Sequence, residues 1–98
     1  MDVQHFRDSL GEERPPRGSS GLLQALWHEA HGDWARAHEL AQREGGRMAA
    51  AVHAYLHRKE GDLANADYWY ERAARKRPAT RLATEWEALV NELLERGK

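Results

Sequence analysis

The chain of 98 residues is long enough for one hydrophobic core and too short for two. Its 15 basic and 16 acidic residues give a net charge of −1, which argues against a nucleic acid or an anionic membrane as the main partner. Cysteine is absent, which excludes disulfides, thiolate metal sites and cysteine nucleophiles. Isoleucine is absent too, and alanine, leucine, glutamate and arginine are abundant, so we predict an all-α protein.

The first 20 residues are predicted to stand apart from the rest of the chain. Three apolar residues have the spacing of a short amphipathic helix capped by Asp2, namely Val3, Phe6 and Leu10. Residues 11–21 are rich in glycine, proline, serine and charge, as in a flexible connection. We expect either a frayed tail or a helix that docks on Leu22, Leu26 and Tyr55, in the same molecule or in a neighbouring one. No signal-peptide core or membrane span is apparent, so a cytoplasmic protein is expected.

Residues 21–98 are predicted to form a single domain of five helices. The first helix ends at Gly32, and the second follows Asp33 and ends at Gly45-Gly46. The third spans about residues 47–60. The fourth begins after Asp62 and is expected to stop before Pro78. The last begins at Thr80 or Thr84, because Thr84 and Glu87 have the spacing of a capping box.

A Gly-Asp pair recurs after 29 residues, at Gly32-Asp33 and Gly61-Asp62. The same offset aligns Ala25 with Ala54, His28 with His57, and Ala37 with Ala66. Repeated helical hairpins bury their apolar faces against one another, so each unit needs its neighbour. The repeat divides the chain into units 21–45 and 46–78, followed by a capping helix at 79–97.

The second unit resembles the tetratricopeptide (TPR) family. It matches that family's pattern G-D-apolar-x-x-A-x-x-x-Y-x-x-A-x-x-x-x-P at Gly61, Asp62, Leu63, Ala66, Tyr70, Ala73 and Pro78. The first unit matches at Gly32-Asp33-Trp34 and Ala37 only. The string HAYLHRKEGDLANADYWYERA (residues 53–73) also resembles a group of small microbial proteins with a TPR-like fold and no assigned activity.

The TPR resemblance implies a right-handed stack of two antiparallel helix pairs with a C-terminal cap. It also implies a groove lined by the first helix of each pair, here by Leu22, Leu26, Met48, Ala51 and Tyr55. This lining is apolar and suits an amphipathic helix from a protein partner. Two repeats offer little surface, so a homodimer is a second way to complete the stack. A small protein-interaction or assembly scaffold is the leading functional interpretation.

Histidines supply the alternative interpretation, a metal-binding protein or hydrolase. His53, His57 and Glu60 lie one helical turn apart on one face, and His28 or His38 can approach from neighbouring helices. Two imidazoles and a carboxylate suit a divalent metal such as zinc. The other possibility, which we favour, is a packed polar seam without a cofactor, in which Arg58, Asn65 and Trp69 satisfy the ring nitrogens. In that seam His53 and His57 are expected to be neutral.

Catalytic residues are not predicted, because the chain lacks a nucleophile elbow and a phosphate-binding glycine loop. In the aromatic run Tyr68-Trp69-Tyr70, Tyr70 is expected to pack in the repeat. Tyr68 or Trp69 is expected to stay partly available to the last helix or to a ligand.

Overall fold

The computed structural model describes residues 1–96, and these contain helices but no strand. The prediction of an all-α protein is confirmed. The six α-helices are α1 (Val3–Asp8), α2 (Gly21–Ala30), α3 (Trp34–Gln42), α4 (Arg47–Glu60), α5 (Leu63–Arg72) and α6 (Leu82–Arg96), and a 3-10 helix (Ser9–Gly11) follows α1. Within the described part of the chain, no helix has both the length and the apolar character that a membrane crossing requires.

Short polar side chains begin four of the helices. Asp2, Ser20, Asp33 and Asp62 each accept a hydrogen bond from the backbone N–H three residues later. Each bond satisfies one of the free donors of a helix's first turn, so the cap fixes where the helix begins. The predicted starts at Asp2, Asp33 and Asp62 therefore agree with the structure.

Two helix ends differ from the sequence prediction. Helix α5 ends at Arg72 rather than just before Pro78, because Ala74 adopts a left-handed conformation with a φ of 60°. The Arg75 N–H then donates to the Tyr70 carbonyl, which closes the helix end. Helix α6 begins at Leu82, so neither Thr80 nor Thr84 starts it and the predicted capping box is wrong.

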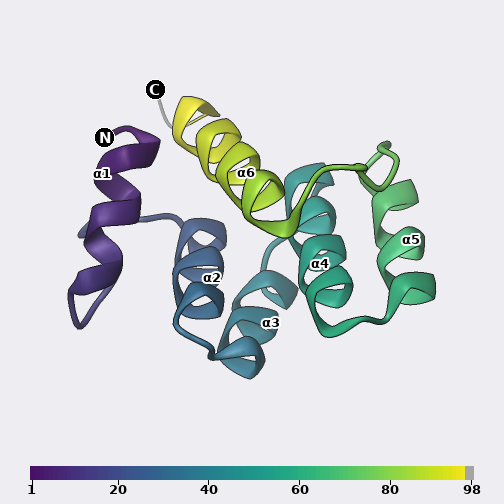
Figure 1. The fold of residues 1–98 in the computed structure, drawn as a ribbon, viewed down its shortest axis with the longest axis horizontal. Coiled ribbons are helices and arrows are strands. Elements are labelled where there is room, and N and C mark those ends of the chain that lie inside the picture. Colours follow the sequence, from purple (N-terminus) through teal and green to yellow (C-terminus); the bar gives the residue numbers. More distant parts are fainter. Residues whose placement is uncertain (97–98) are drawn as a thin grey trace.

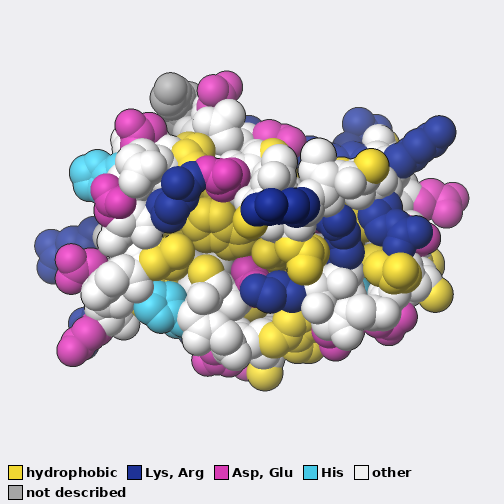
Figure 2. Space-filling model, viewed as in Figure 1, with side chains coloured by type: hydrophobic (Ala, Val, Ile, Leu, Met, Phe, Trp, Pro, Cys, Tyr) yellow, Lys and Arg dark blue, Asp and Glu magenta, His cyan; other side chains and the backbone are white. Residues whose placement is uncertain are grey.

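The helices pack in chain order, and α6 then returns across them (Figure 1). Helix α2 packs against α3, α3 against α4, and α4 against α5. Helix α6 packs on α4, α2 and α1. On the face seen in Figure 2, both basic and acidic side chains surround a band of hydrophobic ones, in keeping with the nearly balanced charge of the chain.

Helix α6 covers the surface that was predicted to be an open groove, so that prediction is wrong. All five expected groove residues are buried in the core: Leu22, Leu26, Met48, Ala51 and Tyr55. Helix α6 adds Trp86, Leu89, Val90 and Leu93 to the same core. The Trp86 indole N–H donates to the Leu26 carbonyl at 3.0 Å, a bond between residues of α6 and α2. The amphipathic helix that the apolar surface suits is therefore the chain's own.

Helix α1 docks on the rest of the molecule through Phe6, which is fully buried. The Phe6 and Trp86 rings lie 5.9 Å apart, so the contact of α1 is with α6 rather than with a free surface of Leu22, Leu26 and Tyr55. The Trp27 indole N–H also donates to the Ser9 carbonyl at 3.3 Å. Of the two alternatives for residues 1–20, the structure has the docked helix.

Candidate functional site

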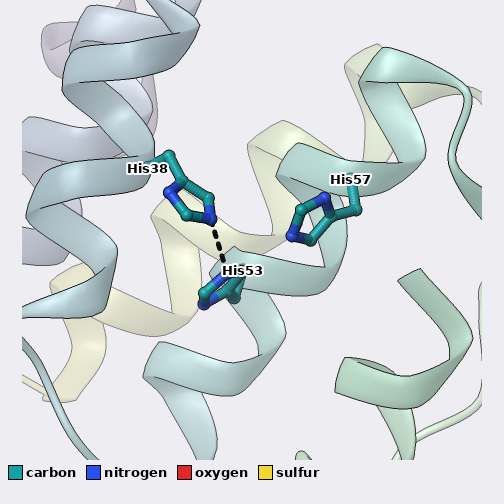
Figure 3. A group of neighbouring side chains, drawn as sticks. All are labelled: His38, His53 and His57. Atoms are coloured by element: carbon teal, nitrogen blue, oxygen red, sulfur yellow. Dashed lines mark hydrogen bonds between the residues drawn. The ribbon is translucent and has the colours of Figure 1, made fainter. Parts of the chain in front are cut away.

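Three histidines converge where α3 meets α4 (Figure 3). His38 comes from α3, and His53 and His57 come from successive turns of α4. One ring nitrogen from each residue lies within 4.8 Å of those of the other two. The Nε2 atoms of His38 and His53 are 2.8 Å apart, so one ring donates a hydrogen bond to the other. We call these three residues the histidine cluster.

Small residues allow the three rings to come so close. Ala37 and Ala41 of α3 and Ala50 of α4 are buried, while Ala54 packs on Ala66 and Tyr70 of α5. Alanines on facing helices let the backbones approach, and the longer histidine side chains then meet between them. The separation of four residues between His53 and His57 places both rings on one face of α4. Their ring centroids are 5.0 Å apart.

Two tryptophans flank the histidine cluster. The Trp34 ring stacks on His38 with a centroid distance of 4.8 Å, and its N–H donates to the Leu56 carbonyl at 2.7 Å. The Trp69 ring stacks on His53 at 3.9 Å and is nearly parallel to it, at 7°. These contacts restrict the rotation of His38 and His53, so the two facing nitrogens are held in position.

Glu60 orients the third ring. The His57 Nδ1–H donates to the Glu60 carboxylate at 2.6 Å. With its proton on Nδ1, a neutral His57 carries a lone pair on Nε2. A carboxylate behind an imidazole is the usual support of a metal-ligating histidine. The Asn65 amide nitrogen also lies 3.4 Å from His57 Nε2.

Burial favours the neutral forms of His38 and His53 by lowering the pKa of each ring. Burial, together with the neighbouring His38 and His57, lowers the pKa of His53 to about 4. The pKa of His38 is also lowered, first by burial and then by His57, although Glu60 opposes the shift. Neutral imidazoles carry the lone pairs that both hydrogen bonds and metal coordination require.

The other residues predicted for this region lie in different places. His28 is not in the histidine cluster, and its ring packs against Trp27 with a centroid distance of 5.2 Å. Arg58 forms its hydrogen bonds elsewhere, because its guanidinium donates to Glu85 and to the Thr80 carbonyl. Asn65 and Trp69 do contact the cluster, on His57 and His53 respectively.

Trp34 is a member of the site that the sequence analysis did not identify. Its spacing of four residues from His38 on a predicted helix was the available signal. In the aromatic run Tyr68-Trp69-Tyr70, Tyr70 is buried and Tyr68 is exposed. Trp69 contacts the histidine cluster, where its ring stacks on His53.

A second group of potential ligands shares His57, with Glu60 and Asp62. Both carboxylates of this group already accept hydrogen bonds. Asp62 caps α5 by accepting from the Asn65 N–H, and Glu60 accepts from His57. Both acidic residues are also exposed, unlike His53 and His57. The histidine cluster is therefore the better candidate for a metal centre.

A cavity of about 640 Å³ begins at His53 and extends toward the start of α4. Its lining comes from the end of α3, the following loop, α4 and α5. The residues are Ala41, Gln42, Glu44, Gly45, Gly46, Arg47, Ala49, Ala50, His53, Trp69 and Arg72. The short side chains of Ala49 and Ala50 leave this space open along the line of α4 that carries His53.

Comparison with known proteins finds no matching protein family, no similar curated protein and no similar solved structure.

Proposed function

We propose that this protein binds a divalent transition-metal ion through His38, His53 and His57. The convergence of three imidazole nitrogens within 4.8 Å supports the proposal most directly. Nitrogens that share a tetrahedral zinc ion lie about 3.3 Å apart, given zinc–nitrogen bonds of about 2.0–2.1 Å. The facing nitrogens of His38 and His53, now 2.8 Å apart, need to separate only slightly, and the ion takes the place of the proton between them.

The donor set favours zinc among the divalent metals. Neutral imidazole suits zinc, copper, nickel and iron, whereas calcium and magnesium prefer oxygen ligands. Three histidines with one open position form a common zinc arrangement. Glu60 supports this function by holding His57 in the tautomer that carries its proton on Nδ1 and a lone pair on Nε2.

Metal binding by the untagged protein tests the proposal. We expect one equivalent of zinc by elemental analysis and by competition with a coloured chelator. His53→Ala and His57→Ala should each weaken binding by tenfold or more, because two imidazoles hold zinc poorly. His28→Ala is the matched control, since His28 lies outside the cluster and should leave affinity unchanged. Equal loss in the control, or no stoichiometric binding at all, would refute the proposal.

We propose a TPR-like stack as the finer description of the fold. The repeated Gly-Asp turns support it, because Gly32 and Gly61 both have positive φ and the aspartate after each caps the following helix. The contacts of α2 with α3 and of α4 with α5 also fit two helical hairpins.

An assembly scaffold is the second candidate function, with a second copy of this chain as the partner. Helix α5 lies at one edge of the fold, where a further repeat would stack (Figure 1). Its outward residues Leu63 and Tyr68 are 45% and 53% exposed. Sedimentation velocity should show a concentration-dependent dimer that Tyr68→Glu abolishes and Glu39→Ala retains. A strict monomer at high concentration would exclude this function.

A further inference from the structure

The cavity beside the histidine cluster has the chemistry of a binding site for an organic anion. His53 is both a member of the cluster and part of the cavity wall, so a molecule in the cavity contacts one of the proposed metal ligands. A volume of about 640 Å³ lies in the range of small-molecule sites. The cavity therefore places a ligand against His53, one of the three proposed metal ligands.

The charged side chains that line the cavity favour an anionic ligand. The cavity is lined by two guanidinium groups, Arg47 and Arg72, and by one carboxylate, Glu44. Among the residues that the structure describes, neither arginine pairs with a carboxylate, whereas Arg58 and Arg75 do. Arg72 donates to the Tyr68 hydroxyl at 3.2 Å and lies over the Trp69 ring, which leaves part of its donor fork for a ligand. A bound divalent metal would add two further positive charges.

The apolar part of the cavity lining favours a carboxylate that carries a short alkyl chain. Ala41, Ala49 and Ala50 form an apolar part of the lining, and Trp69 adds an aromatic ring. Apolar contact of this kind does not help an inorganic phosphate, which is charged on all sides. An arginine holds a carboxylate through two parallel hydrogen bonds, and an alkyl chain then covers the alanines.

We propose that the cavity binds a small aliphatic carboxylate beside the metal ion. This inference rests on the proposed metal function, because a metal ion held by His53 would contribute part of the positive charge beside the cavity. Arg47 and Arg72 bind the carboxylate, while the alanine wall contacts its carbon chain.

The test uses the full-length protein loaded with cobalt(II), whose visible absorption reports the coordination of the ion. Butyrate is the probe, with inorganic phosphate and propylammonium as competitors of different chemistry. We expect saturable spectral changes with butyrate, binding at least tenfold weaker for phosphate, and none for propylammonium. Amide chemical shifts of Ala49 and Ala50 should move with butyrate alone, which locates the ligand in the cavity.

Arginine variants separate the cavity from the metal. The double variant Arg47→Ala, Arg72→Ala should keep the cobalt spectrum and weaken butyrate binding at least tenfold. Arg72→Lys keeps the positive charge near Trp69. It should therefore bind butyrate more tightly than the single variant Arg72→Ala does. Arg36→Ala is the control, since Arg36 pairs with Glu39 and does not line the cavity.

Each outcome is decisive. A protein that does not bind cobalt refutes the metal function and this inference together. A protein that binds cobalt but does not respond to butyrate refutes only the inference. Equal responses to butyrate and phosphate, or unchanged affinity in the double variant, would show that the carboxylate assignment is wrong.

Discussion

Glu85 is a buried carboxylate on which three helices depend. Its carboxylate accepts from the Arg58 guanidinium at 2.7 Å and from the Tyr70 hydroxyl at 2.6 Å. These residues come from α6, α4 and α5, so a single side chain connects three helices. Burial and the Glu85 carboxylate raise the pKa of Tyr70 well above its usual range, which keeps its hydroxyl proton available for the bond.

Removing this carboxylate should destabilise the fold strongly. Glu85→Ala leaves Arg58 and Tyr70 without their partner, and breaking a buried pair costs about 3–5 kcal/mol. Glu39→Ala is the control, because Glu39 forms exposed ion pairs with Arg36 and Arg43, each of which contributes about 0–1 kcal/mol. Urea unfolding measures both free energies. Equal effects of the two substitutions would contradict the role of Glu85.

The histidine cluster should make the stability of the metal-free protein depend on pH. The pKa of His53 is about 4 in the folded protein and about 6.5 in the unfolded chain. Between these values the unfolded chain binds more protons, so the free energy of unfolding falls as pH drops from 6.5 to 4 and levels off below. The expected loss from His53 is about 3 kcal/mol. The lowered pKa of His38 acts in the same direction.

Urea unfolding of chelator-treated protein from pH 7.5 to 4 checks this dependence. His53→Gln should flatten the response, and the difference between the two curves removes the contribution of ordinary carboxylates. Stability that rises on acidification would show that the Glu60 carboxylate keeps the cluster charged instead.

At the scale of the helices, Gly61 and Ala74 occupy equivalent places after α4 and α5. Both have positive φ, 89° and 60° respectively. In each case the next N–H donates to a carbonyl five residues earlier, from Asp62 to His57 and from Arg75 to Tyr70. Glycine adopts this conformation freely, whereas alanine strains it by about 1 kcal/mol.

Exchanging the two residue types should therefore change stability in opposite directions. Ala74→Gly is expected to raise the free energy of unfolding by about 0.5–1 kcal/mol, and Gly61→Ala to lower it by about 1 kcal/mol. A Cβ at position 61 meets no atom within 4 Å, so the loss there reflects backbone conformation alone. Thermal melts of both variants give the comparison. A loss of stability in Ala74→Gly would contradict the assignment.

Local chemistry explains why most helix boundaries were predictable. The caps Asp33 and Asp62 and the stops Gly32 and Gly61 act through their own backbone neighbours, so they are visible in the sequence. The end of α5 was not predictable, because an alanine takes the place of the usual glycine at position 74. The same limit applies to the site. Spacing on one helix pairs His53 with His57, but only the packing of α3 on α4 selects His38 and leaves out His28.

At the scale of the whole molecule, an apolar face in the sequence does not identify the surface that covers it. The sequence identified Leu22, Leu26 and Tyr55 as an apolar surface, and the structure shows α6 on it. An attached helix has an effective local concentration that a separate partner rarely matches. Residues 73–81 are long enough to let α6 return over α4 and α2. Helix α6 thus covers an apolar surface that would otherwise be open to a partner.

Most of the stability that helix α1 adds to this core should come from Phe6. Phe6 is fully buried, it contacts Trp86, and α1 has no other buried residue. Phe6→Ala is expected to lower the free energy of unfolding by about 3–5 kcal/mol, a large share of the 5–15 kcal/mol typical of a small domain. Val3→Ala, at a half-buried position of the same helix, should cost only about 1 kcal/mol.

Urea unfolding of the two variants gives these values, and a hydrophobic dye reports the exposed surface. Phe6→Ala should bind more dye than Val3→Ala, and deletion of residues 1–18 should bind most, because the deletion uncovers Trp86 beneath α1. If the deletion leaves both dye binding and stability unchanged, α1 is not part of the core in solution. If Phe6→Ala and Val3→Ala destabilise equally, the contact of Phe6 with Trp86 does not hold the helix in place.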